Sequence, residues 1–237
     1  TLARVRHEMF TDEAIGRLID EVRAGLDPDA EPGSSIEGDL ARVVARDWEK
    51  ARRVPSELRA EMTRAASLAM PVWVKARQES DFSQFLPALR TNIELRRRYV
   101  ECFDDYDEPY DVLLDDFEPG MKTAEVKAVF DVLRPELTAI VREAGEPADD
   151  SFLEGVYPVA TQQEFLEGVL RDFGFPEGTY RLDPTVHPFA TTFSRTDIRM
   201  TTRYKPTNLR ALWAAMHEAG HGLTYLGTEP SLARSPL

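Results

Sequence analysis

The chain has 237 residues, of which 29 are basic and 42 acidic, so its formal net charge is −13. A surface this acidic argues against nucleic acids and anionic membranes as partners, because both bind through cationic patches. No apolar run is long enough for a membrane helix, and the first residues show no signal-peptide pattern. The single cysteine, Cys102, cannot form an internal disulfide, which favours a reducing compartment such as the cytoplasm.

Apolar residues recur at helical spacing through most of the chain. The pattern fills residues 1–26 apart from a break near Thr11, and it resumes over residues 36–54. A later pattern begins after Asp81, which is a good N-cap residue. These patterns predict long, antiparallel helices.

Residues 104–118 are rich in aspartate and glutamate. One interpretation is a surface that binds cations or basic substrates. The other is a solvated helix face, because apolar residues are interleaved with the acids and no calcium-loop spacing is present. The sequence favours the solvated helix face.

The character of the sequence changes after Pro176. Before it, Thr161 and Glu164 form the pattern of a capping box for a helix that ends at Gly174. After it, residues 179–204 contain two alternating runs of β-branched and aromatic residues separated by a turn, which predict an antiparallel β-hairpin. A strand of such a hairpin can pair with an extended peptide through its backbone groups, and this hairpin is a candidate for that role.

Residues 217–221 read His-Glu-Ala-Gly-His. Side chains four positions apart share one face of an α-helix, so the imidazoles of His217 and His221 can bind one metal ion. Glu218 then faces the open coordination position, where it can take a proton from the attacking water as a general base. Flanking apolar residues at helical spacing, with Thr207 as N-cap, predict the required helix. The alternative is a surface helix that carries two histidines and no metal.

Three segments resemble, in chain order, signature motifs of the carboxypeptidase Taq family of metallocarboxypeptidases. They are His-Pro-Phe at residues 187–189, Asp-Ile-Arg-Met-Thr at residues 197–201 and His-Glu-Ala-Gly-His at residues 217–221. Residues 109–121 and 1–18 are also similar to that family, so the resemblance extends over nearly the whole chain. It implies a mainly α-helical fold with a small β-element beside a long groove. It also implies removal of C-terminal amino acids from peptides, zinc (Zn²⁺, with Co²⁺ as a substitute) as cofactor, and a homodimer.

Carried over residue by residue, the resemblance makes His217 and His221 the metal ligands and Glu218 the general base. In the family the third protein ligand is a glutamate in a later motif, and this sequence stops before any such motif. Glu229, the only acidic residue after Glu218, stands in a different context. Both ends of the chain look cut. We therefore expect a fragment that lacks the extreme N-terminus and the C-terminal part, and that is inactive without the third ligand.

His187, Asp197 and Arg199 are candidates for binding substrate or for supporting the metal ligands. The guanidinium of Arg199 suits a free α-carboxylate, and Asp197 can orient a ligand histidine. The alternative for these two is an ion pair that stiffens the hairpin. His187 can donate to the substrate or to the developing oxyanion, and its alternative is a structural His-Pro turn.

The sequence thus predicts one incomplete helical metallopeptidase domain over residues 1–237. It comprises a helical region at 1–175, a β-hairpin region at 176–206 and the metal-binding helix at 207–227. The predicted fold is mainly α, a bundle of long antiparallel helices with a small antiparallel β-hairpin next to the metal helix. The expected function is that of a zinc metallocarboxypeptidase acting on peptides with a free C-terminus. The alternative is a non-catalytic helical scaffold or peptide-binding fragment.

Overall fold

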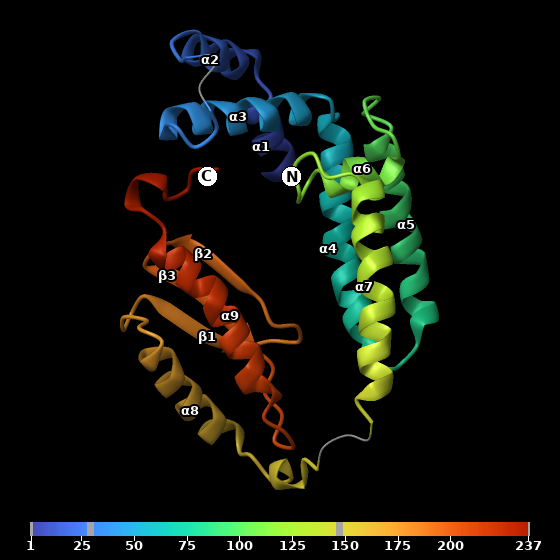
Figure 1. Cartoon of the computed structure of the whole chain (residues 1–237), viewed down its shortest axis with the longest axis vertical. Helices are drawn as coiled ribbons and strands as arrows, with labels where there is room; N and C mark the ends of the chain where they lie inside the picture. The colour runs from blue at the N-terminus through green and yellow to red at the C-terminus, as the bar shows by residue number, and fades with distance from the viewer. Residues whose placement is uncertain (1, 28–30, 146–148, 237) are drawn as a thin grey trace. The chain divides into compact units, whose positions relative to one another are not determined.

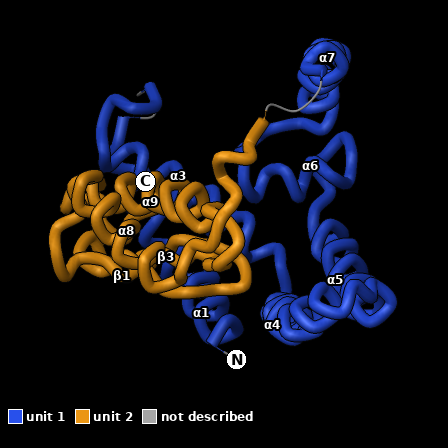
Figure 2. Tube along the Cα trace, turned by 90° about the horizontal axis from the view of Figure 1, so that it is seen from below, with its two compact units in different colours: residues 1–145 blue, residues 146–237 orange. Residues whose placement is uncertain are grey.

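The computed structural model describes residues 2–27, 31–145 and 149–236, which contain nine α-helices and one three-stranded sheet (Figure 1). The predicted mainly α-helical fold with a small β-element is therefore confirmed. The chain forms two compact units, residues 1–145 and 146–237, and the boundary falls inside the predicted helical region (Figure 2). No helix in the described residues is both long and apolar enough to cross a bilayer.

The first unit is built from helices. They are α1 (Leu2–Phe10), α2 (Glu13–Ala24), α3 (Ile36–Arg52), α4 (Ser56–Gln78), α5 (Phe82–Val100), α6 (Pro109–Leu114) and α7 (Thr123–Glu143). The predicted break near Thr11 separates α1 from α2, while Thr1 lies outside the described residues. Asp81 caps α5 as predicted, because its Oδ1 accepts a hydrogen bond from Ser83 N at 3.0 Å.

The core of the first unit lies along α4 and α5. Residues 79–81 connect these two helices, so α5 returns antiparallel to α4. The buried side chains of this core are Val54, Leu58, Met62, Leu95, Tyr99, Val100, Phe103 and Val112. The apolar spacing of the sequence correctly predicts this antiparallel pair.

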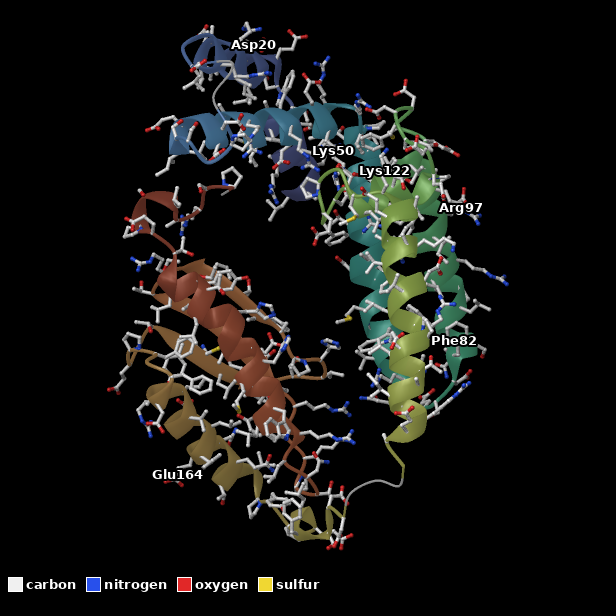
Figure 3. All side chains as sticks on the ribbon, in the orientation of Figure 1. Asp20, Lys50, Phe82, Arg97, Lys122 and Glu164 are labelled. Atoms are coloured by element: carbon white, nitrogen blue, oxygen red, sulfur yellow. The ribbon has the colours of Figure 1, made fainter. Side chains whose placement is uncertain are left out.

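The acidic stretch between α5 and α7 is not uniformly solvated. Asp111 is only 5% exposed, and its carboxylate accepts hydrogen bonds from the hydroxyl and the backbone N–H of Thr123 at 2.6 and 2.7 Å. These bonds lower the pKa of Asp111 to about 2. Asp115 Oδ2 lies 2.8 Å from Arg46 Nη2 and 2.6 Å from Nζ of Lys50 (Figure 3). The solvated-face prediction is wrong for these aspartates, because their partners come from segments that the local sequence does not reveal.

The second unit places a small sheet against two helices. It contains α8 (Val159–Asp172), β1 (Tyr180–Pro184), β2 (Ala190–Ser194), β3 (Asp197–Thr202) and α9 (Arg210–Gly227), with 3-10 turns at Ser151–Leu153 and Pro230–Leu232. β2 and β3 form the predicted antiparallel hairpin, but the sheet order is β1-β3-β2 and β1 pairs in parallel with β3. The sequence does not predict this parallel pairing, because no local turn joins the two strands and the return path of the chain decides it.

Two helices begin at residues other than those predicted. α8 begins before Thr161, which lies in its first turn rather than at the N-cap, and Glu164 is exposed on its surface (Figure 3). α9 begins at Arg210 rather than after Thr207, and Asn208 Oδ1 accepts a hydrogen bond from Arg210 N at 3.1 Å. Both predicted caps are wrong. Several neighbouring residues can take the N-cap position of a helix, and tertiary packing selects among them.

α9 lies directly against β3 through a face of very small residues. Ala219 is fully buried and Gly222 is buried, and both face the core around Ile198 and Met200. A Cβ atom at Gly222 would lie 2.9 Å from Cζ of Phe175 and 3.1 Å from Sδ of Met200. The missing side chain at this position therefore sets how closely the helix approaches the sheet.

Gly222→Ala is predicted to destabilise the protein. Overpacking a tight core costs about 1–3 kcal/mol, whereas the better helix propensity of alanine recovers at most about 1 kcal/mol. Gly220→Ala is the matched control in the same helix, because a Cβ there meets nothing within 4 Å and only the propensity gain remains. Thermal unfolding should show a lower midpoint for Gly222→Ala and a higher one for Gly220→Ala. A higher midpoint in both variants would contradict the close packing.

Candidate metal centre

His217 and His221 lie on one exposed side of α9. Their ring centroids are 5.1 Å apart and the ring planes meet at 83°. Two imidazoles bound to one tetrahedral ion, with metal–nitrogen distances of about 2.0–2.1 Å, have centroids roughly 5 Å apart. The two side chains therefore fit as two ligands of a single metal ion.

Glu218 lies on the side of α9 between the buried alanines and the histidines. Successive helical residues turn by about 100°, which puts Glu218 next to His221 and at the margin of the face that packs on the sheet. Glu218 is only 6% exposed, and its carboxylate forms no hydrogen bond with any residue in the described part of the chain. Its carboxylate is thus uncommitted to other side chains there, as a general base requires.

The Glu218 side of α9 faces the β2 edge of the sheet. α8 packs on the other side of the helix, where Leu166 and Leu212 line the same apolar hollow. Glu218 and His221 lie across the buried stripe of α9 from Leu212, so they face away from α8. α8 packs toward Leu182 of β1, whereas α9 crosses β3 and β2 (Figure 1). The side of α9 that faces away from α8, with Glu218 and His221, is therefore the side toward β2.

Among the described strands, β2 has a free edge, because β3 lies between it and β1; at the end of β2, the carbonyl oxygen of Phe193 accepts a hydrogen bond from Arg234 Nη2 at 2.7 Å. Phe189 and Thr201 form a hydrogen-bonded pair, in which Thr201 N donates to Phe189 O at 2.9 Å. Bonded and non-bonded pairs alternate along an antiparallel ladder, so Ala190 and Thr192 turn their N–H and C=O groups outward. The sequence predicts the hairpin but not these groups, because the direction of main-chain atoms depends on the register of the strands.

Asp197 and Arg199 form an ion pair with each other. Arg199 Nε lies 2.8 Å from Asp197 Oδ1 and Nη2 lies 3.1 Å from Oδ2, and this contact lowers the pKa of the Asp197 carboxyl. The alternate residues Ile198 and Met200 face α9, so the ion pair lies on the opposite face of β3. The structure does not bring Asp197 to either histidine, and the ion-pair interpretation describes it.

His187 is exposed on the segment that leads into β2. Its Nδ1 lies 2.8 Å from the carbonyl oxygen of Pro188, its neighbour in the chain. A carbonyl only accepts, so Nδ1 carries the proton and Nε2 of the neutral ring is an acceptor. Donation from Nε2 to a substrate therefore requires the imidazolium form, and the His-Pro turn interpretation fits the observed bond.

The described residues provide two candidate metal ligands. Within residues 2–27, 31–145 and 149–236, no group of three His, Cys, Asp or Glu side chains is arranged to hold a metal ion. Glu229 is exposed beyond the end of α9, at the start of the Pro230–Leu232 turn. A catalytic zinc normally has three protein ligands, so His217 and His221 would supply two of the usual three.

Comparison with known proteins identifies the family to which the chain belongs. The family model of carboxypeptidase Taq (M32) metallopeptidases matches residues 1–237. The chain belongs to this family. The resemblance that the three motifs indicate is confirmed, and a divalent metal is part of the chemistry of the family.

Three relatives show how much of the family fold the chain contains. It is 33% identical over 242 residues to thermostable carboxypeptidase 1 of Pyrococcus furiosus, covering 100% of this chain and 48% of that protein. It is 34% identical over 242 residues to thermostable carboxypeptidase 1 of Thermus thermophilus, covering 94% and 46%. The BsuCP crystal structure aligns with a TM-score of 0.89 at 31% identity, covering 100% of this chain and 48% of that one. The chain thus spans about half the length of these carboxypeptidases.

Asp197→Asn is predicted to leave zinc affinity unchanged, because Asp197 contacts Arg199 on the face of β3 that points away from α9. A carboxylate that orients a ligand histidine normally supports metal affinity by about 10–100-fold. Competition titration with a chromophoric chelator measures the affinity, and His217→Ala serves as the positive control. A tenfold loss, or more, in Asp197→Asn would show that Asp197 does reach a ligand.

Proposed function

We propose that the complete enzyme is a zinc-dependent carboxypeptidase that releases C-terminal amino acids from peptides. The observation that carries the proposal is the position of His217, His221 and Glu218 on adjoining sides of α9, with Glu218 and His221 toward the free edge of β2. Family membership and the carboxypeptidase relatives support the same activity. Zinc is the proposed ion because imidazole is one of its preferred ligands in hydrolytic sites, and cobalt is the proposed substitute.

The roles of the three side chains follow from their chemistry. His217 and His221 hold the ion through one ring nitrogen each. When bound, divalent zinc lowers the pKa of water and polarises a carbonyl group. Glu218 takes a proton from water as the water oxygen attacks the scissile carbonyl carbon, and it passes that proton to the departing amine as the C–N bond breaks. One water is consumed, and Glu218 returns to its starting state.

The substrate is proposed to add to the sheet as a strand along β2. Ala190 and Thr192 offer outward N–H and C=O groups to the peptide backbone, next to the side of α9 that carries Glu218. Arg199 remains a candidate for the free α-carboxylate, although its Nε and Nη2 are paired with Asp197 on the face of β3 that points away from α9. His187 is a candidate for contact with the same peptide, because its segment leads into β2.

For this chain by itself, we propose weak zinc binding and no peptidase activity, because two protein ligands hold an ion less firmly than three. The complete enzyme is proposed to form a homodimer in a reducing compartment such as the cytoplasm. The family resemblance supports the dimer, and the single cysteine supports the compartment.

A second candidate function is non-catalytic peptide binding by a helical scaffold. The free edge of β2 favours it, because strand addition needs only backbone groups. Peptide binding that resists chelators and His217→Ala would support this role. Release of amino acids by the purified chain in excess zinc would exclude it.

His217→Ala and His221→Ala are each predicted to weaken zinc binding by this chain by at least about tenfold, because each removes one of two ligands. His187→Ala is the matched control, since it removes an exposed imidazole that does not belong to α9. Isothermal titration with zinc checks the prediction. Equal affinities in all three variants and the parent would place the ion elsewhere.

In the complete enzyme, Glu218→Gln is predicted to lower kcat by about 10²–10⁴-fold, which is the usual contribution of a general base. Glutamine keeps the shape of the side chain but cannot take the proton, so bound zinc should remain. A chelator should abolish the release of C-terminal residues from a peptide, and added zinc should restore it. Near-normal turnover by the zinc-loaded Glu218→Gln variant would show that the proposed base is wrong.

A further inference from the structure

Two side chains of the β2–β3 hairpin hold α9 by hydrogen bonds to its backbone, one near each end of the helix. Near the start of α9, the fully buried Thr202 donates through Oγ1 to the carbonyl oxygen of Ala211 at 2.9 Å. Near its end, Arg195 donates to the carbonyl oxygen of Leu226, with Nη2 at 2.9 Å and Nε at 3.3 Å. The metal-ligand candidates lie between these two points of attachment.

The distance between the two attachment points is similar along the helix and along the hairpin. The helix between Ala211 and Leu226 is about 22 Å long, and the hairpin from Arg195 to Thr202 is at most about 23 Å long. Both bonds therefore form at once when β3 runs antiparallel to α9. A shift of the helix along the strand by one residue would strain one bond or break the other.

The bond from Arg195 also suits the end of a helix. The carbonyl of Leu226 is among the last four of α9, which have no donor within the helix. The last turn of α9 contains no basic residue, so the cation that favours the negative end of the helix dipole comes from the hairpin turn. Arg195 therefore supplies both a hydrogen-bond donor and a positive charge at this end.

We propose that Arg195 is a positioning residue of the metal centre. The small apolar residues of α9 allow close contact with β3, but such contact has little directional preference. Hydrogen bonds do have a preferred direction, so Arg195 and Thr202 fix where α9 sits along the hairpin and how it is turned. They thereby hold Glu218 and His221 toward β2, with His217 beside them on the exposed side of α9. The inference rests on the proposed function for its link to peptide hydrolysis, but the position of the helix does not.

The test compares zinc affinity with local helix order in this chain. Arg195→Met removes both donors at similar length and is expected to weaken zinc binding by about tenfold, at the lower end of the effect of residues that support metal ligands. Amide hydrogen exchange over residues 223–227 should become faster in the metal-free variant. Arg195→Lys, which keeps the charge and one donor, should restore most of the affinity and protection. Thr202→Val, which keeps the side-chain shape, should weaken zinc binding through the other attachment point.

Tyr180→Phe is the matched control, because it removes only the hydroxyl that donates to Glu167 in the same unit and no hydrogen bond to α9. It should lower thermal stability while leaving zinc affinity and exchange over residues 223–227 unchanged. Unchanged affinity and exchange in Arg195→Met would overturn the proposal. An equal loss of zinc affinity in Tyr180→Phe would also overturn it, because the loss in Arg195→Met would then follow from lower overall stability and not from the position of α9.

The design separates this inference from the proposed metal site. If His217→Ala binds zinc as well as the parent chain, the metal assignment fails, whereas faster exchange in Arg195→Met would still show the attachment of α9. If Arg195→Met does not fold, Arg195→Lys and Thr202→Val provide the same comparison. Parent-like zinc affinity in Thr202→Val would then overturn the proposal.

Discussion

The contact between α9 and β3 through alanine and glycine is the constraint on which the metal centre depends. Ala215, Ala219 and Gly222 follow one another on the buried face of α9, where a larger side chain would push the helix off the sheet. With that face occupied, the helical turn leaves His217 and His221 outward. Glu218 falls at the margin and is buried, but its carboxylate has no hydrogen bond to the described residues. The chemistry is therefore a consequence of which side of the helix can approach the strand.

The groups that make up the candidate centre all come from the second unit. The hairpin supplies the surface on which α9 rests, the free edge of β2 and the two attachment points at Arg195 and Thr202. The first unit has its own apolar core along α4 and α5, and ionic contacts such as that between Lys50 and Asp115 join its segments. The chain spans about half the length of its carboxypeptidase relatives. It contains both α9, which carries the His-Glu-Ala-Gly-His motif, and the β2–β3 hairpin on which α9 rests.

Local patterns in the sequence predict much of this arrangement. The four-residue spacing of His217 and His221 needs only a helix to bring the rings together, and the alternating runs give the β2–β3 hairpin. The same alternation, with Ile198 and Met200 as the apolar members, already places Asp197 on the far face from α9. The parallel strand β1 and the bond from Arg195 to Leu226 depend on residues distant in sequence, so no local pattern reveals them.

X-ray absorption spectroscopy of this chain with one equivalent of zinc tests the central claim most directly. The account predicts a first shell of nitrogen and oxygen at about 2.0–2.1 Å, with the outer scattering of two imidazoles. In His217→Ala the scattering should fall to that of one imidazole. A shell without imidazole scattering, or the same spectrum in the parent and the variant, would contradict a zinc site on α9.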